Sequence, residues 1–150
     1  MILWGVSSFA TVDGIGALYV SGRWHTKGHQ VVYMASNPAT SLLESIVHME
    51  IDNEDRPTTY QALKVEGPDD VSREVLRPGT GSLPENWPSD ITITQAFGDV
   101  WIEEKRSLLL EVPSVLVPET WNVLFNPLHP EAGSFHIVAV YQHAFDPRLF

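Results

Sequence analysis

A chain of 150 residues with 43% hydrophobic residues is long enough to bury a sizeable core, and this composition excludes a disordered protein. The formal net charge of −10 argues against direct binding to a nucleic-acid backbone, and the absence of cysteine excludes disulfides, thiol nucleophiles and cysteine-bound metals. The sequence has no apolar run long enough for a membrane span and no secretory signal at its start. We therefore expect one domain over residues 1–150.

The first part of the chain predicts a strand, a loop and a second short strand. Residues 1–8 alternate as a strand does, although Gly5 has no side chain to pack there. Residues 9–21 contain Asp13-Gly14, which predicts a loop. The apolar run at residues 31–35 predicts the next strand, and Tyr33 lies within it.

The best-marked element is a helix that starts after residue 37 and runs to about Glu50. Ser36 or Asn37 can cap this helix, and Pro38 suits its first position. Glu44 lies beside the apolar stripe of the helix, so we expect its carboxylate at the edge of the core, partly desolvated and facing a cleft. The stripe consists of Ala39, Leu42, Leu43, Ile46 and Val47.

In the rest of the chain the predicted strands and helices follow no regular alternation. A charged connection at residues 52–57 precedes a predicted strand at 58–65 and a long irregular segment at 67–88. A second helix is predicted from Ser89 or Asp90 through Trp101. Strands are predicted at 107–112 and 135–141. Residues 115–117 are expected to stay extended. The asparagines of residues 121–130 are expected to brace turns. Two helices among five or six strands predict an α+β fold.

Three common chemistries find little support in the sequence. His25 with His29, and Glu44 with His48, are the candidate metal pairs, and neither has the further ligands that zinc or iron requires. We therefore predict no metal site. No Gly-x-Ser-x-Gly sequence marks a serine hydrolase, and the glycines near residue 15 are too few for a phosphate-binding loop.

One set of residues suits cleavage of the nicotinamide–ribose bond of NAD. The leaving group of this reaction is already cationic, and a carboxylate such as Glu44 would stabilise the oxocarbenium-like transition state. Arg23 would bind the pyrophosphate with its planar fork, and Tyr33 would stack on nicotinamide or brace the sugar. Ser114 would orient the ribose or the glutamate. All four residue types are common, so this match alone is not specific.

Ordered motifs run along nearly the whole chain. They are Gly22-Arg23-Trp24-His25, Val32-Tyr33, Ser41-Leu42-Leu43-Glu44 with His48, Leu83-Pro84 with Trp87, Gly98-Asp99, Val112-Pro113-Ser114, residues 122–130, and Asp146-Pro147-Arg148-Leu149. Together these motifs resemble the RES domain family. The family is named after an arginine, a glutamate and a serine, which match Arg23, Glu44 and Ser114, and Tyr33 matches a further tyrosine of its pattern.

The resemblance implies an ADP-ribosyltransferase-like fold, with mixed and antiparallel sheets and flanking helices. It implies a cytoplasmic bacterial toxin that is neutralised in a hetero-oligomer with an Xre-type antitoxin, without direct contact to nucleic acid or membrane. NAD would be the substrate, and no cofactor is expected. The resemblance assigns catalysis to Arg23, Tyr33, Glu44 and Ser114, and substrate binding to His25 and Asn126.

The resemblance leaves the activity open among several kinds. The leading prediction is hydrolysis or phosphorolysis of NAD, and the alternative enzyme transfers ADP-ribose to a protein. Family members carry an arginine early in the first strand, where this chain has Gly5, so a weakened activity is expected. A third interpretation is a catalytically weak protein whose main role is to bind the antitoxin.

Overall fold

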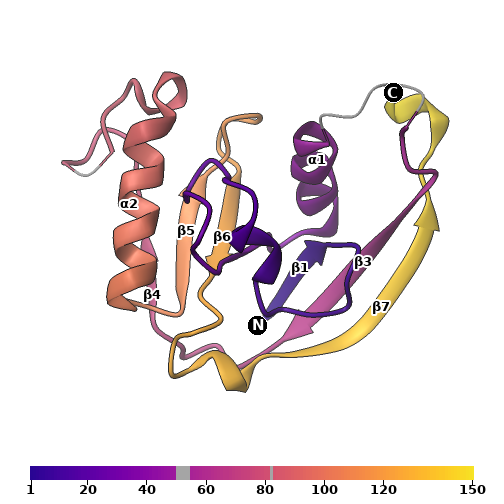
Figure 1. The fold of residues 1–150 in the computed structure, drawn as a ribbon, viewed down its shortest axis with the longest axis horizontal. Coiled ribbons are helices and arrows are strands. Elements are labelled where there is room, and N and C mark those ends of the chain that lie inside the picture. Colours follow the sequence, from indigo (N-terminus) through magenta and orange to yellow (C-terminus); the bar gives the residue numbers. More distant parts are fainter. Residues whose placement is uncertain (50–54, 82) are drawn as a thin grey trace.

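Two sheets and two α-helices form the α+β fold that the sequence predicts (Figure 1). The computed structural model describes residues 1–49, 55–81 and 83–150. One sheet has the antiparallel order β1-β3-β7, with β1 at Ile2–Val6, β3 at Thr59–Glu66 and β7 at His136–Ala144. The other has the order β2-β6-β5-β4, with β2 at Val32–Met34, β6 at Trp121–Phe125, β5 at Leu109–Pro113 and β4 at Arg73–Val75.

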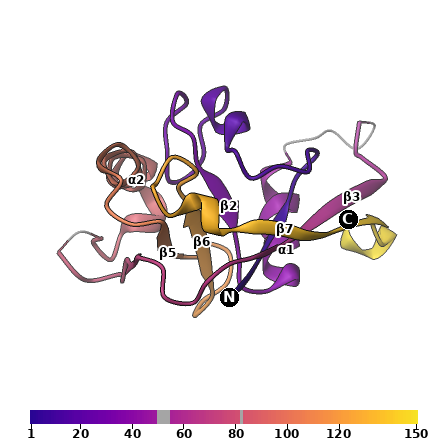
Figure 2. The ribbon, with the colours of Figure 1, turned by 90° about the horizontal axis from the view of Figure 1, so that it is seen from below.

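The two sheets meet where the end of β2 lies against β1. The amide of Trp4 donates a hydrogen bond to the Ala35 carbonyl at 2.7 Å, and the amide of Ala35 donates to the Trp4 carbonyl at 2.9 Å. Strand β4 is parallel to β5, whereas the other neighbours in the second sheet are antiparallel. In Figures 1 and 2, α2 lies at the end of the molecule opposite the C-terminus, and α1 lies close to β1.

Both helices begin at the caps that the sequence marks. Helix α1 (Pro38–His48) starts after Asn37, whose side chain accepts hydrogen bonds from the amides of the first turn. Helix α2 (Ile91–Glu104) starts after Asp90 in the same way and ends at Lys105, which has a left-handed conformation. The expected end of α1 near Glu50 and part of the connection at 52–57 lie outside the described residues.

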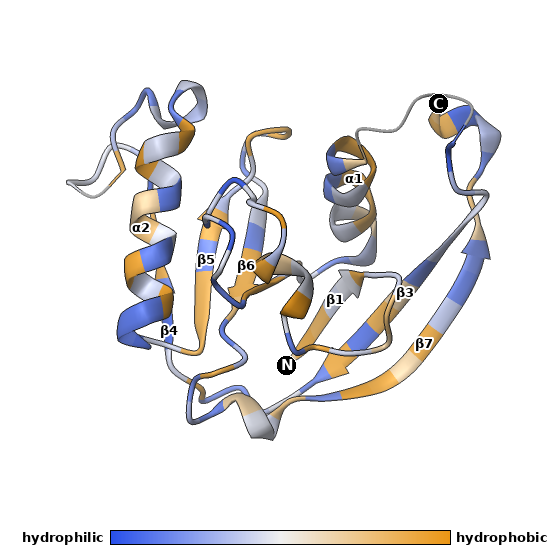
Figure 3. Ribbon diagram, in the orientation of Figure 1, coloured by the Kyte–Doolittle hydropathy of each residue, from blue (hydrophilic) through white to orange (hydrophobic). Residues whose placement is uncertain are grey.

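Successive side chains of β5 and β6 point to opposite faces of the sheet, and they divide the core into two clusters. Leu109 and Phe125 pack with the inner residues of β1 and β3. Leu110 and Leu124 point to the opposite face and pack with Trp101 of α2. Because both faces of this sheet are covered, β5 and β6 are mostly hydrophobic, as Figure 3 shows.

Several local predictions are wrong. The segment predicted as irregular contains β4 and the 3-10 helix Trp87–Ser89, and residues 121–125 form β6 rather than a turn. Residues 115–117 bend instead of staying extended, because the Ser114 hydroxyl accepts hydrogen bonds from the amides of Leu116 and Val117. The structure therefore has more strands in its described residues than the sequence predicts.

The expected core face of α1 is also wrong. Leu43 and Val47 of the apolar stripe are 40% and 49% exposed. A second stripe, which is polar and has the same helical spacing, lines the inner side of the helix instead. It consists of Ser41, Glu44, Ser45 and His48, all of which line one pocket. The helix therefore presents its polar side chains to a pocket.

Candidate functional site

Glu44 lies at the centre of a small hydrogen-bonded cluster from three elements. Its carboxylate oxygen Oε1 accepts hydrogen bonds from the Ser114 hydroxyl at 2.6 Å and from Nδ2 of Asn122 at 2.9 Å. Glu44 comes from α1, Ser114 follows β5 and Asn122 lies on β6. The structure thus brings together two residues that the sequence assigned to catalysis, and it adds Asn122.

The turn after β5 fixes the direction of the Ser114 hydroxyl. Its oxygen accepts hydrogen bonds from the Leu116 amide at 3.0 Å and from the Val117 amide at 3.3 Å. Because these two bonds occupy the oxygen's acceptor positions, its single proton points to Glu44. Both of these donors reach Oε1, and no donor among the described residues reaches Oε2, so Oε2 stays available to a ligand in the pocket that Glu44 lines.

The Glu44 pocket has the size of a single ring. Its volume is about 150 Å³, and its walls include Tyr33, Met34 and Asn122 as well as the polar stripe of α1. An engineered protein cavity of similar volume binds benzene. A carboxylate at such a wall can stabilise a positive charge that develops on a ligand next to the ring.

Tyr33 is held from behind by the loop that precedes it. Nε2 of His25 lies 2.9 Å from the Val20 carbonyl and 3.2 Å from the Ala17 carbonyl, and since carbonyls only accept, this nitrogen carries the proton. Nδ1 of neutral His25 therefore accepts the hydrogen bond from the Tyr33 hydroxyl at 2.7 Å. The Trp24 amide donates to the same hydroxyl at 3.1 Å. The Tyr33 hydroxyl is therefore hydrogen-bonded within the protein, whereas the Tyr33 ring lines the Glu44 pocket.

Burial sets the protonation states of this pair. Desolvation raises the pKa of Tyr33 well above its ordinary value, and the hydrogen bond from the Trp24 amide offsets part of this effect. Desolvation also lowers the pKa of His25, although the two carbonyl contacts oppose the shift. Both side chains are therefore neutral near pH 7. His25 does not line the Glu44 pocket itself and contacts it only through the Tyr33 hydroxyl.

The loop that carries Arg23 and His25 is fixed to α2. Gly98 lies so close to the loop that an added Cβ atom would be 1.7 Å from the Trp24 carbonyl oxygen. The neighbouring Asp99 accepts hydrogen bonds from the Thr26 amide at 2.9 Å and from the Thr26 hydroxyl at 2.7 Å. The Gly98-Asp99 pair therefore positions the loop behind Tyr33.

Arg23 and Asn126 lie apart from the Glu44 cluster. The Arg23 guanidinium donates a hydrogen bond to the Pro88 carbonyl at 3.4 Å and lies 6.0 Å from the centre of the Trp87 ring. Its charge does act on Tyr33, whose pKa it lowers slightly against the larger effect of burial. Asn126 is fully buried, and its amide donates to the Ile102 carbonyl while its oxygen caps the following turn. The assigned roles of both residues stay predictions.

The sequence analysis did not name Asn122 as a site residue, although Asn122 belongs to the Glu44 cluster. It was expected to brace a turn, as Asn126 does, whereas it lies on β6 and donates to Glu44. Asparagine is uncommon inside β-strands, and its presence between apolar residues was the signal in the sequence for a role other than packing.

Gly5 lies beside Tyr33 and Met34 rather than beside the Arg23 loop. A Cβ atom at Gly5 would have ordinary van der Waals contacts, 3.9 Å from the Tyr33 carbonyl oxygen and 4.0 Å from the Met34 side chain. The backbone there leaves room for a larger residue. The weaker activity expected from this glycine stays a prediction.

The described residues hold no group of three or more histidine, aspartate or glutamate side chains arranged to bind a metal ion. None of the helices in residues 1–49, 55–81 and 83–150 is long and apolar enough to cross a lipid bilayer.

A solved structure shares this fold. The toxin–antitoxin complex MbcT–MbcA of M. tuberculosis contains a chain that superposes with a TM-score of 0.73 over 95% of this chain and 84% of its own length. At 13% sequence identity, this likeness shows the fold alone. The chain is thus an α+β protein that shares the fold of this neighbour, with a helix-borne carboxylate at a pocket the size of a single ring.

Sequence comparison identifies the family. The RES domain matches residues 2–146. A protein of Pseudomonas putida named Toxin Res is 45% identical over 150 residues, which cover all of both chains. A protein of Sphingobium sp. named Prs ADP-ribosylating toxin is 37% identical over 142 residues, covering 92% of this chain and 86% of that protein. The chain belongs to the RES domain family.

Proposed function

We propose that this protein is the toxin of a toxin–antitoxin pair and that it degrades NAD by cleaving the nicotinamide–ribose bond. The observation that carries the proposal is the Glu44 carboxylate, which Ser114 and Asn122 hold at the wall of a ring-sized pocket. Family membership supports it, since relatives from Pseudomonas putida and Yersinia enterocolitica are named Toxin Res.

In this proposal the nicotinamide ring occupies the pocket of about 150 Å³, against the ring of Tyr33. Cleavage leaves positive charge on the ribose carbon, and Oε2 of Glu44 stabilises this charge. The donors at Oε1 keep the carboxylate oriented, so little reorganisation is needed as the charge develops. Arg23 contributes its charge from the loop behind Tyr33, and the acceptor of the ribosyl group is water or phosphate.

The second candidate is transfer of ADP-ribose to a protein, because one relative is named Prs ADP-ribosylating toxin. Both reactions release nicotinamide, and they differ in the product that keeps the ADP-ribose. We further propose that an Xre-type antitoxin binds the chain in the cytoplasm. The structural neighbour supports an antitoxin partner, because it comes from a toxin–antitoxin complex.

Incubating the purified protein with NAD separates these candidates. Free nicotinamide together with ADP-ribose, or with ADP-ribose 1-phosphate when phosphate is present, supports NAD degradation. Label from the adenylate part of NAD that becomes bound to protein in a cell extract supports the transferase. Intact NAD in both assays would contradict the proposed function and leave antitoxin binding as the main role.

A further inference from the structure

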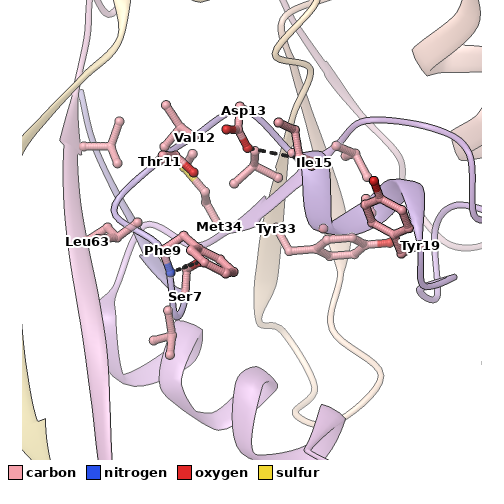
Figure 4. A pocket seen from close by; sticks show the side chains of 18 residues that line it. Ser7, Phe9, Thr11, Val12, Asp13, Ile15, Tyr19, Tyr33, Met34 and Leu63 are labelled. Carbon is pink, nitrogen blue, oxygen red and sulfur yellow. Dashed lines mark hydrogen bonds between the residues drawn. The ribbon is translucent and has the colours of Figure 1, made fainter.

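A second and larger cavity lies on the other side of Tyr33. Its volume is about 650 Å³, and it lies between the loop that follows β1 and strand β2 (Figure 4). Most of its lining is apolar, with Val12, Ile15, Val31 and Leu63 among the walls. This volume is more than four times that of the Glu44 pocket, which is about 150 Å³, so the cavity can take a ligand part larger than one ring.

The two cavities share walls. Tyr33 and Met34 line both of them, and Gly5 contributes to the larger one. The two cavities are therefore adjacent, a placement that suits the two ends of one extended ligand. NAD has this form, because a small nicotinamide ring and a larger adenosine are joined through one ribose and a pyrophosphate.

Two exposed aromatic side chains stand at the larger cavity. Phe9 is 73% exposed and Tyr19 is 75% exposed, and both belong to its lining. In Figure 4 they lie toward opposite ends of the drawn side chains, with Tyr33 between them. Aromatic rings with so much free surface are suited to stack on the flat face of a base.

The charges at this cavity favour one kind of nucleotide. Asp13 lies in its lining, with Oδ1 accepting a hydrogen bond from the Ile15 amide at 3.0 Å. No lysine or arginine is among its described lining residues. A carboxylate accepts hydrogen bonds from ribose hydroxyls, whereas it repels a phosphate group in the same place.

We propose that this cavity is the adenosine subsite of the substrate, that one of its two exposed rings, Phe9 or Tyr19, stacks on the adenine, and that Asp13 selects NAD over NADP. The inference rests on the proposed function, because it takes the dinucleotide to be the substrate. It adds the place and the specificity of the adenosine half, which the residues around Glu44 do not determine.

Binding of adenosine 5′-monophosphate tests the subsite without any turnover. Isothermal titration calorimetry compares the wild-type protein with Phe9→Ala and Tyr19→Ala. The matched control is Tyr141→Ala, because Tyr141 is also exposed, at 52%, and lies on β7 outside this cavity. We expect affinity to fall about ten-fold in one of the two cavity variants, the one that removes the stacking ring, which is the scale of one lost stacking contact. The control should bind like the wild type.

Adenosine 2′,5′-bisphosphate, which represents the adenosine half of NADP, tests the role of Asp13. The wild-type protein should bind it at least ten-fold more weakly than adenosine 5′-monophosphate. Asp13→Asn keeps an oxygen for the Ile15 amide and removes the charge, so it should narrow this difference. Circular dichroism shows whether each variant is folded.

Equal affinity of the wild-type, Phe9→Ala and Tyr19→Ala proteins for adenosine 5′-monophosphate would overturn the subsite, even if the protein cleaves NAD. Binding that depends on one of these two aromatic residues supports the subsite, even if nicotinamide release is not seen. An unchanged preference between the two nucleotides in Asp13→Asn would overturn the selection by Asp13.

Discussion

Asn122 helps to orient Glu44, the carboxylate that we propose to be catalytic. It donates a hydrogen bond to the same oxygen of Glu44 as Ser114 does, so it holds the carboxylate in one orientation. We expect Asn122→Ala to lower kcat for NAD about ten- to hundred-fold with little change in KM, because an orienting contact is lost while the pocket remains.

Asn122→Asp is the sharper companion variant. It keeps the size of the side chain and replaces the donor with a second carboxylate, which repels Glu44. Steady-state kinetics at pH 7.5 should therefore rank wild type above Asn122→Ala and Asn122→Ala above Asn122→Asp. An aspartate variant as active as the wild type would show that this hydrogen bond does not matter for the reaction.

Tyr33 is expected to act through its ring. Its hydroxyl is already bonded to His25 and to the Trp24 amide, so Tyr33→Phe should keep kcat within about ten-fold of wild type. The same variant leaves a buried nitrogen of His25 without its donor, which should cost about 1–3 kcal/mol of unfolding free energy. Urea denaturation and NAD turnover measure the two effects separately. A Phe variant that is stable but inactive would give the hydroxyl a direct role.

Single residues also show what could be inferred before the structure was known. The residue pattern placed Tyr33 on a strand and Glu44 beside a cleft, because strand and helix periods are local properties. The residue pattern suggested that Ser114 orients the ribose or the glutamate, but it did not indicate that Asn122 joins Ser114 at one oxygen of Glu44. Three separate elements must fold together to create that contact.

At the scale of elements, the attachment of the loop at residues 22–31 to α2 should depend on pH through His29. One ring nitrogen of His29 lies 2.9 Å from the Thr26 carbonyl, and the other lies 2.8 Å from a carboxylate oxygen of Glu103. Both neighbours are acceptors, so the doubly protonated ring fits best. The hydrogen bond to Glu103 is the main reason why the pKa of His29 is raised above 6.5.

The sign of the effect follows from this shift. Protonated His29 adds its full stability below about pH 6.5, and the contribution is lost as pH rises through the raised pKa. His29→Gln should therefore lower the free energy of unfolding more at pH 5.5 than at pH 9, by about 0.5 kcal/mol, as for a solvent-exposed ion pair. His25, whose pKa is lowered, is present in both proteins and cancels in the difference.

Thermal unfolding of the wild-type and His29→Gln proteins across this pH range measures the difference. The gap in Tm should be about 1–2 °C at pH 5.5 and should close at high pH. A gap that is constant with pH would mean that His29 stabilises the loop without its charge.

Helices with a capping residue at their start were predicted well. The short strand β4 and the inner face of α1 were not. Asn37 and Asp90 mark both helix starts, because capping is a local interaction. Strand β4 has three residues and exists only because β5 pairs with it, so residues 73–75 carry little signal of their own. The inner face of α1 was misjudged because a polar stripe faces the pocket where a core-facing stripe is usually apolar.

At the scale of the whole molecule, the net charge of −10 should govern association with the proposed antitoxin. A partner with a basic surface would be attracted over long distances, and salt would screen this attraction. Stopped-flow measurements should show an association rate that falls at least ten-fold between about 50 and 500 mM salt. An association rate that does not change with salt would exclude electrostatic steering.

The most direct test of the account is nicotinamide release from NAD by the wild-type protein and by Glu44→Gln. The variant keeps the shape of the side chain and removes the charge that faces the pocket of about 150 Å³. The account predicts nicotinamide release by the wild type and a loss of at least about 100-fold in the variant, with unchanged circular dichroism and Tm. A folded Glu44→Gln protein that releases nicotinamide as fast as the wild type would contradict it.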